Sequence, residues 1–334
     1  LVDLETGAEL LLTPHERPAS FGRPVFSPDG RTVWLSSNAG RELAAFARIR
    51  LGTGGPPGPI EVVASREDAE LDAFEIDEAG LTAALVWNVA GKSELAFVDL
   101  GTGRSRPGPA LPSEIASGLV FSPDGTRLAM VLSGSAAPMD VWVLDRAKGS
   151  LRQLTRSPHA GVDLASLVKP TLVRFPALDG LPLSGWLYRP RGASGPGPIV
   201  LSFHGGPEAQ ERPSFRSDYQ ALVSRGISVL APNVRGSSGF GRRFVNLDNG
   251  ALRKGAVEDI AAAAGWAVRS GAADAKRIGI MGGSYGGYMT MAGLASYPGV
   301  FAAGANLFGI VNFGTFFRNT EPWMAAISKN EYGD

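Results

Sequence analysis

The chain has 334 residues, enough for two domains with sizeable cores, and its 44% hydrophobic and 19% charged residues are typical of a globular protein. Lys plus Arg and Asp plus Glu each total 32, so the net charge is zero, and no basic stretch points to a nucleic-acid partner. The sequence contains no cysteine, which excludes disulfides, thiolate metal sites and a cysteine nucleophile.

The apolar runs and the N-terminal residues of the chain indicate in which compartment the protein is expected. No run approaches the roughly 18 apolar residues of a membrane span, so we expect no membrane partner. The chain starts "LVDLETGAELLLTP", without Met and without the basic-then-apolar pattern of a signal peptide. We therefore expect an N-terminally truncated, cytoplasmic protein, with a signal peptide ahead of Leu1 left open. No cofactor or metal signature is present, and a homo-oligomer is left open.

The first half contains an internal repeat. "FSPDGRTVWLSS" starts at Phe26 and "FSPDGTRLAMVL" at Phe121, with "FEIDEAGLTAALVW" between them at Phe74, so the intervals are 48 and 47 residues. A second series of turn motifs runs in step and ends at Gly7, Gly54, Gly103 and Gly149. In the Pro-Asp-Gly turns, proline fixes φ, aspartate bonds its own backbone, and glycine accepts a positive φ.

Short β-type runs flank these turns, and we predict strands at residues 32–37, 95–100, 127–132 and 140–145. Four short strands in roughly 40 to 50 residues are typical of a β-propeller blade, and a β-sandwich with similar hairpins is the alternative. About three blades fit into residues 1–165, whereas a closed propeller takes roughly four to eight. We therefore expect further blades upstream of this chain.

The second half changes from strands alone to alternating strands and helices. A hairpin is predicted around Asp179-Gly180 in residues 172–188. The expected strands then cover residues 199–203, 227–232, 277–282 and 301–309, and the expected helices residues 215–226, 257–271 and 288–298. This alternation predicts a doubly wound, mostly parallel sheet. We place the boundary near residues 165 to 172, which gives domains at 1–165 and 166–334.

A serine lies at the turn between a predicted strand and a predicted helix. The stretch "GGSYGG" satisfies G-x-S-x-G in the strand–turn–helix context of an α/β-hydrolase, which makes Ser284 the candidate nucleophile. The flanking positions must be nearly free of side chains for strand and helix to approach, and they are Gly282, Gly283, Gly286 and Gly287. The alternative, a glycine-rich dinucleotide-binding turn, lacks both G-x-G-x-x-G and a later acidic residue.

A second glycine-rich loop follows an earlier predicted strand. It reads His204-Gly205-Gly206-Pro207, and in α/β-hydrolases such a loop supplies one donor of the oxyanion hole. We predict the backbone N–H groups of Tyr285 and Gly206 as the two donors. The fold orders its triad Ser, Asp, His, so His204 precedes the position of the base and is predicted to be structural.

With "HGGP", "APNVRGSSGFGRRF" and "GGSYGGYMT" in this order behind propeller-like repeats, the chain resembles the prolyl oligopeptidase family of serine peptidases. It is most similar to the acylaminoacyl-peptidase and dipeptidyl-aminopeptidase-like branches. The resemblance implies an α/β-hydrolase domain with a propeller that restricts access to short peptides, Ser284 as nucleophile, and the oxyanion donors named above. In some members a tyrosine hydroxyl is the second donor, but "HGGPEAQ" favours a backbone amide here. Arg235 is expected to order its loop by ion pairing, with a substrate contact as the alternative.

The histidine base of the family is not found where the pattern expects it. All three histidines, His15, His159 and His204, precede Ser284, and the later acidic residues are Glu321, Glu331 and Asp334, none in a setting typical of the triad acid. We therefore expect the catalytic Asp and His beyond residue 334, a chain truncated at both ends, and little activity from this chain alone.

The sequence leaves the substrate open. A serine peptidase acting on short peptides is the main hypothesis, and an esterase or a non-catalytic propeller–hydrolase binding protein are the alternatives. The aromatic stretch at residues 308–323 is predicted either to pack in the core or to line the S1 side of a cleft, and its largest side chains are Phe313, Phe316, Phe317 and Trp323.

Overall fold

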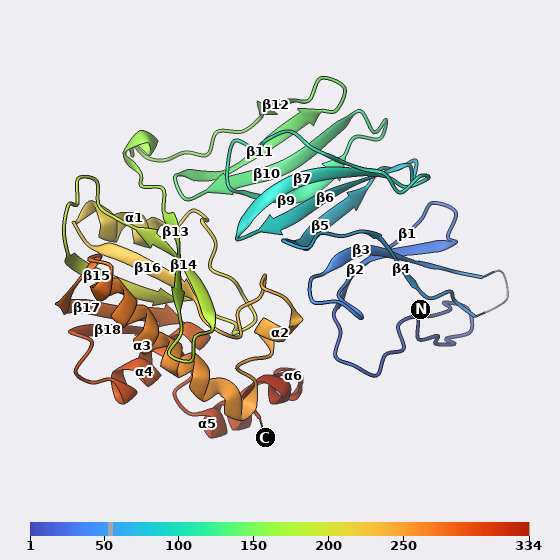
Figure 1. Ribbon diagram of the computed structural model, residues 1–334. Helices are drawn as coiled ribbons and strands as arrows, with labels where there is room; N and C mark the ends of the chain where they lie inside the picture. The colour runs from blue at the N-terminus through green and yellow to red at the C-terminus, as the bar shows by residue number, and fades with distance from the viewer. Residues whose placement is uncertain (53–55, 334) are drawn as a thin grey trace. The chain divides into compact units, whose positions relative to one another are not determined.

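The structure is a computed structural model that describes residues 1–52 and 56–333, so Gly54 and Asp334, named above, lie outside the described residues. The chain divides into two compact units, which Figure 1 displays in one ribbon. The first comprises Leu1–Ser133, Met139–Pro158 and Phe240–Arg242, and the second Gly134–Pro138, His159–Gly239 and Arg243–Asp334.

The first unit is built from three four-stranded antiparallel sheets in which each strand pairs with the next along the chain, as in a propeller blade. The first sheet contains β1 (Phe21–Phe26), β2 (Thr32–Ser37), β3 (Ala45–Arg50) and β4 (Ile60–Ala64). The second contains β5 (Glu70–Ile76), β6 (Thr82–Val89), β7 (Lys92–Asp99) and β8 (Ser105–Pro107). The third contains β9 (Ile115–Phe121), β10 (Arg127–Gly134), β11 (Ala137–Asp145) and β12 (Ser150–Gln153). The three predicted blades are therefore confirmed.

The repeated turn has the same hydrogen bonds in the first and third sheets. The hydroxyl of Ser27 donates to Asp29 at 2.6 Å, and that of Ser122 donates to Asp124 at 2.6 Å. In the second sheet Asp77 replaces the serine, and its carboxylate accepts from the backbone N–H groups of residues 81 and 82. The sequence repeat thus marks the turn that joins the first two strands of each blade.

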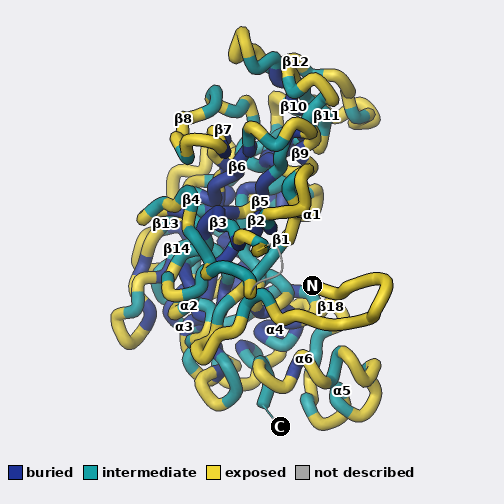
Figure 2. The backbone as a smooth tube through the Cα atoms, turned by 90° about the vertical axis from the view of Figure 1, so that its right-hand side faces the viewer, coloured by how far each residue is buried: buried dark blue, intermediate teal, exposed yellow. Residues whose placement is uncertain are grey.

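The central strand β6 is buried on both faces and supplies the core on either side of its sheet (Figure 2). Leu85 and Trp87 belong to the cluster shared with the first blade, whereas Ala84 and Val86 belong to the cluster shared with the third. Successive side chains of a strand point to opposite faces, so the uninterrupted apolar run of β6 is what a blade between two neighbours requires.

The second unit contains a six-stranded sheet in the order β13-β14-β16-β15-β17-β18. The strands are β13 (Thr171–Pro176), β14 (Pro182–Tyr188), β15 (Gly197–Phe203), β16 (Ser228–Asn233), β17 (Ala273–Gly283) and β18 (Ala303–Leu307). The first two form the predicted antiparallel hairpin, and β16, β15, β17 and β18 run parallel to one another. This is the mostly parallel sheet of an α/β-hydrolase domain, as predicted.

Helices cover both faces of this sheet. The helices along the chain are α1 (Ser217–Ser224), α2 (Arg242–Val245), α3 (Arg253–Arg269), α4 (Tyr285–Ser296), α5 (Phe313–Asn319) and α6 (Pro322–Tyr332), with 3-10 turns η1 (Leu164–Ser166) and η2 (Gly250–Leu252). Of these, α1, α3 and α4 cover the sheet. Helix α1 packs on the face that carries Trp186 and Val229, whereas α3 and α4 pack on the opposite face, against Leu201 and Ile280 (Figure 1). Helix α4 starts three residues earlier than expected, directly after Ser284. Helices α5 and α6 were not predicted from the sequence.

The last strand, β18, lies at the edge of the sheet and pairs with β17. All five of its residues are exposed (Figure 2). Within residues 1–52 and 56–333, no helix has the length and apolar character needed to cross a membrane.

Packing between the second and third blades predicts a graded loss of stability. Leu128 in β10 is fully buried, so Leu128→Ala should lower the free energy of unfolding by about 2–5 kcal/mol, through lost apolar burial and a cavity. Val120 in the neighbouring strand β9 is 58% exposed, and Val120→Ala should change the free energy of unfolding by no more than about 0.5 kcal/mol. Chemical denaturation of the two variants measures this difference, and equal losses would contradict the packing.

Candidate active site

Ser284 is the single residue between strand β17 and helix α4. Its φ is 55° and its ψ −120°, a backbone conformation that residues other than glycine rarely adopt and that stores strain. The turn is held from both sides, because Ser284 N–H donates to the carbonyl of Leu307 at 3.1 Å and Gly287 N–H donates to the Ser284 carbonyl at 2.9 Å. This geometry is the one expected of a nucleophile on a sharp strand-to-helix turn.

The glycines around Ser284 lie where a side chain cannot fit. A Cβ on Gly282 would collide with the carbonyl of Gly286, and a Cβ on Gly286 would collide with the carbonyl of Phe203. Gly287 faces Asn306 and the backbone of Gly309 in the same way. Gly283 is less constrained, since a Cβ there would lie 3.2 Å from the Phe308 ring. The close approach of β15, β17 and α4 therefore depends on three glycines of the motif.

The HGGP loop lies beside the serine. A Cβ placed on Gly205 would lie 3.5 Å from Ser284 Cβ and 3.9 Å from Ser284 Oγ. The next residue, Gly206, has a φ of 129°, which only glycine tolerates well. Tyr285 is the first residue of α4, so helix geometry gives its N–H no acceptor within the helix. The structure thus brings together the loop, the serine and the helix N-terminus named in the sequence analysis.

His204 has both ring nitrogens engaged. Nδ1 lies 2.7 Å from the carbonyl of Gly205 and Nε2 lies 2.9 Å from the hydroxyl of Ser237. Burial lowers the pKa of His204, so the neutral ring is favoured, and the contact with the Gly205 carbonyl places its proton on Nδ1. These contacts fit the structural role that was predicted. Among the described residues, no histidine ring hydrogen-bonds Ser284.

Arg235 sits between two carboxylates. Its guanidinium makes two hydrogen bonds to Asp259 at 2.8 and 2.9 Å and two to Asp179 at 2.9 and 3.0 Å. Asp259 lies in α3 and Asp179 in the turn between β13 and β14, so one side chain ties the hairpin and a helix to the loop after β16. These ion pairs support the predicted ordering role, and a substrate contact stays the alternative.

The side chain of Tyr285 is buried and points into a charged network. Its hydroxyl donates to Asp248 at 2.9 Å, and Arg253 reaches the same carboxylate at 3.1 Å. Burial raises the pKa of Asp248, and the charge of Arg253 opposes that rise. Sequence reasoning missed both Asp248 and Arg253, because "NLDNGALRK" has no spacing that distinguishes a buried ion pair from an exposed one.

The aromatic stretch forms a cluster on helices α5 and α6. The Phe313 ring lies 5.1 Å from Tyr288 and 4.7 Å from Tyr332, and Phe316 lies 5.7 Å from Tyr332. Phe316 also contacts Phe317, while Trp323 is 61% exposed. Core packing and the lining of an S1 cleft both stay predictions for these side chains.

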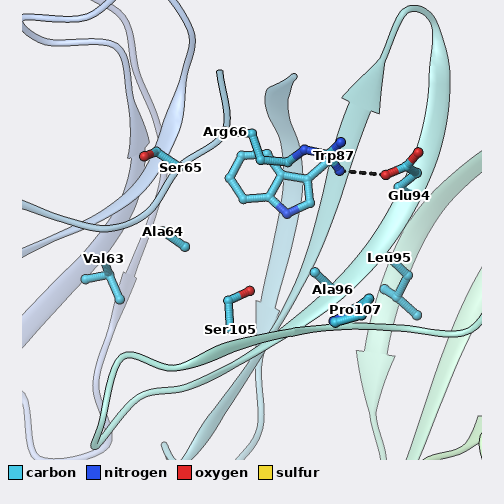
Figure 3. A pocket seen from close by; sticks show the side chains of 10 residues that line it. All are labelled: Val63, Ala64, Ser65, Arg66, Trp87, Glu94, Leu95, Ala96, Ser105 and Pro107. Atoms are coloured by element: carbon cyan, nitrogen blue, oxygen red, sulfur yellow. Dashed lines mark hydrogen bonds and ion pairs between the residues drawn. The ribbon is translucent and has the colours of Figure 1, made fainter. Parts of the chain in front are cut away.

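A cavity of about 390 Å³ lies in the blade unit (Figure 3). Its wall includes Trp87 and an ion pair between Arg66 and Glu94 at 2.6 Å, and none of the predicted site residues lines it. In the part of the chain that the structure describes, no group of three His, Asp or Glu side chains is arranged to hold a metal ion.

A carboxyl group lies buried in the segment that follows the HGGP loop. The backbone N–H of Glu211 donates to Asn233 Oδ1 at 2.7 Å, and Asn233 Nδ2 donates back to the Glu211 carbonyl at 3.0 Å. Burial raises the pKa of the Glu211 side chain to about 7, despite the nearby charge of Arg216. Glu211 therefore titrates near neutral pH.

Comparison with known proteins identifies part of the chain. Residues 213–334 match the prolyl oligopeptidase family. The chain is 30% identical over 319 residues to dipeptidyl aminopeptidase BIII of Pseudoxanthomonas mexicana, an alignment that covers 89% of this chain and 44% of that protein. The chain thus spans less than half the length of this curated relative.

Solved structures show the same fold. A puromycin-hydrolysing peptidase of Mycobacterium tuberculosis superposes with a TM-score of 0.82 at 23% identity, over 95% of this chain and 49% of that one. The acylaminoacyl peptidase of Pyrococcus horikoshii superposes with a TM-score of 0.75 at 24% identity, over 94% of this chain and 48% of that one. The predicted combination of propeller blades and an α/β-hydrolase domain is confirmed.

The contact between Gly286 and Phe203 predicts a strong substitution effect. Gly286→Ala should force α4 away from β15, lower the free energy of unfolding by about 3 kcal/mol or more, and displace Ser284. Gly299→Ala is the matched control, because no atom lies within 4 Å of the added methyl group. Thermal unfolding of both variants measures the effect, and equal stability would show that the helix does not approach the strand so closely.

Glu211 predicts a pH effect. Burial raises the pKa of Glu211 from 4.5 to about 7. The contribution of the protonated side chain to the free energy of unfolding is therefore fully present below pH 4.5 and is lost as the pH rises through 7. The total loss is on the order of 3 kcal/mol. Glu211→Gln mimics the protonated form, so the variant should gain stability relative to the unmodified protein between pH 5 and pH 8. Unfolding curves across this range measure the difference, and a difference independent of pH would refute the raised pKa.

Proposed function

We propose, from the premise that residues 213–334 form a prolyl oligopeptidase family domain, that this chain is part of a serine peptidase that cleaves short peptides. Ser284 is the nucleophile in this proposal. The supporting observation is its backbone, which holds a non-glycine residue at φ 55° on a one-residue turn between β17 and α4. Strain of this kind persists only where surrounding contacts enforce it, and it presents the serine side chain at the end of the parallel strands.

The proposed reaction is acyl transfer through Ser284. Its Oγ attacks the carbonyl carbon of the scissile peptide bond while a general base accepts the hydroxyl proton. The oxyanion of the tetrahedral intermediate accepts hydrogen bonds from Tyr285 N–H and Gly206 N–H. The intermediate collapses to an acyl-enzyme, the base returns the proton to the leaving amine, and water then releases the acid. The family pattern expects the histidine base and its orienting acid after Ser284.

The blades support the assignment of short peptides as substrates. Three four-stranded sheets precede the hydrolase domain in the sequence, and the family resemblance implies a propeller that restricts access to short peptides. Residues 1–165 and 166–334 are the two domains in this proposal. The named relatives are a dipeptidyl aminopeptidase, an acylaminoacyl peptidase and a puromycin-hydrolysing peptidase, each of which is longer than this chain.

The test is covalent labelling and turnover of the full-length protein. A fluorophosphonate probe should label Ser284, and Ser284→Ala should abolish labelling and lower kcat for a peptide anilide by about 10⁶-fold. Ser296→Ala, an exposed serine at the end of the same helix, should retain both.

A short acyl ester tested beside the anilide separates the two hydrolase classes. Turnover of the ester alone would make the protein an esterase. Absence of labelling at Ser284 would instead indicate a binding protein without acyl chemistry.

A further inference from the structure

A buried ion pair lies behind the candidate oxyanion hole. Asp248 is 0% exposed, and its Oδ2 accepts both the Tyr285 hydroxyl at 2.9 Å and Arg253 Nη1 at 3.1 Å. The Arg253 guanidinium also lies 5.0 Å from the centre of the Tyr285 ring. Tyr285 is thus fixed at its hydroxyl by the carboxylate and at its ring face by the cation.

The same arginine reaches the other candidate donor through α6. Its Nη2 donates to the backbone carbonyl of Glu331 and lies 3.4 Å from the Glu331 carboxylate. The guanidinium lies 4.9 Å from the centre of the Tyr332 ring, and the Tyr332 hydroxyl donates to the Gly206 carbonyl at 3.3 Å. The cation therefore connects to the peptide backbone of the HGGP loop through one side chain.

The carboxylate has no room to move. Gly236, with a φ of 93°, packs its backbone so closely against Asp248 that a Cβ there would collide with the carboxyl group. The carboxylate is thus enclosed by the loop after β16, by Tyr285 and by Arg253. A rigid carboxylate of this kind can fix the orientation of the side chain that it binds.

We propose that the buried Asp248–Arg253 ion pair positions both N–H donors of the oxyanion hole, Tyr285 directly and the Gly206 loop through Tyr332. This inference rests on the proposed function and adds two positioning residues to it. Burying an ion pair contributes little to stability compared with apolar residues of the same size, so stability alone does not account for the pair. Oxyanion donors are sensitive to their position, because they must lie about 2.7–3.1 Å from the developing charge.

The network predicts a specific kinetic defect in Tyr285→Phe. This variant keeps the ring, the backbone N–H and the stacking on Arg253, and it loses only the hydrogen bond to Asp248. In the full-length protein, kcat for a peptide anilide should fall about tenfold while KM stays within about twofold. The affinity for a peptide aldehyde, which forms a tetrahedral adduct with the serine, should weaken by a similar factor, about tenfold.

Two further variants separate positioning from folding. Tyr288→Phe removes the hydroxyl of the half-buried neighbour that stacks on Tyr285 at 5.5 Å, and it should leave kcat unchanged. Asp248→Asn keeps the shape of the side chain and removes its charge. Combined with Tyr285→Phe, it should show a non-additive loss of kcat.

The outcomes distinguish this inference from the proposed function. If Tyr285→Phe lowers the unfolding temperature but retains kcat and aldehyde affinity within twofold, the network is only structural and the inference is wrong. In that case Tyr285→Phe causes no loss of kcat that Asp248→Asn could share. If the unmodified full-length protein shows no labelling at Ser284, the proposed function fails first, and the inference fails with it.

Discussion

Contact between glycine backbones is the constraint on which the candidate site depends. Gly286 at the start of α4 lies directly against the carbonyl of Phe203 at the end of β15, and Gly282 lies against the carbonyl of Gly286. Because these contacts admit no Cβ, the helix begins within one residue of β17, and Ser284 takes its strained φ of 55°. The reactive position of the serine is therefore a product of main-chain packing.

Two buried arginines organise what surrounds that turn. Arg235 joins Asp179 and Asp259 and so holds the loop after β16 to the hairpin and to α3. Arg253 joins Asp248 and the end of α6. Each arginine offsets the desolvation of a carboxylate that is fully buried, and each links segments far apart in the sequence. The segments around Ser284 are thus held together by a few buried ion pairs between arginine and aspartate side chains.

The sequence could predict what is local. The "FSPDG" turns recur because each blade uses the same hydroxyl–carboxylate hydrogen bond, and "GGSYGG" is visible because strand, serine and helix are contiguous. Asp248 and Arg253 could not be predicted, because their role depends on Tyr285, Gly236 and α6 meeting in space. The early start of α4 was missed because Gly286 and Gly287 read as a turn by propensity, whereas packing against β15 makes them helical.

The exposed strand β18 gives the hydrolase sheet an edge at which a further strand can pair. Its sequence, "AGANL", is uncharged and small, and within the described residues its strand partner is β17. Natural edges are usually blunted by charge, proline or a bulge, and β18 contains no charged residue or proline. The side of β18 away from β17 can therefore pair with another extended segment, supplied by the same polypeptide or by another one.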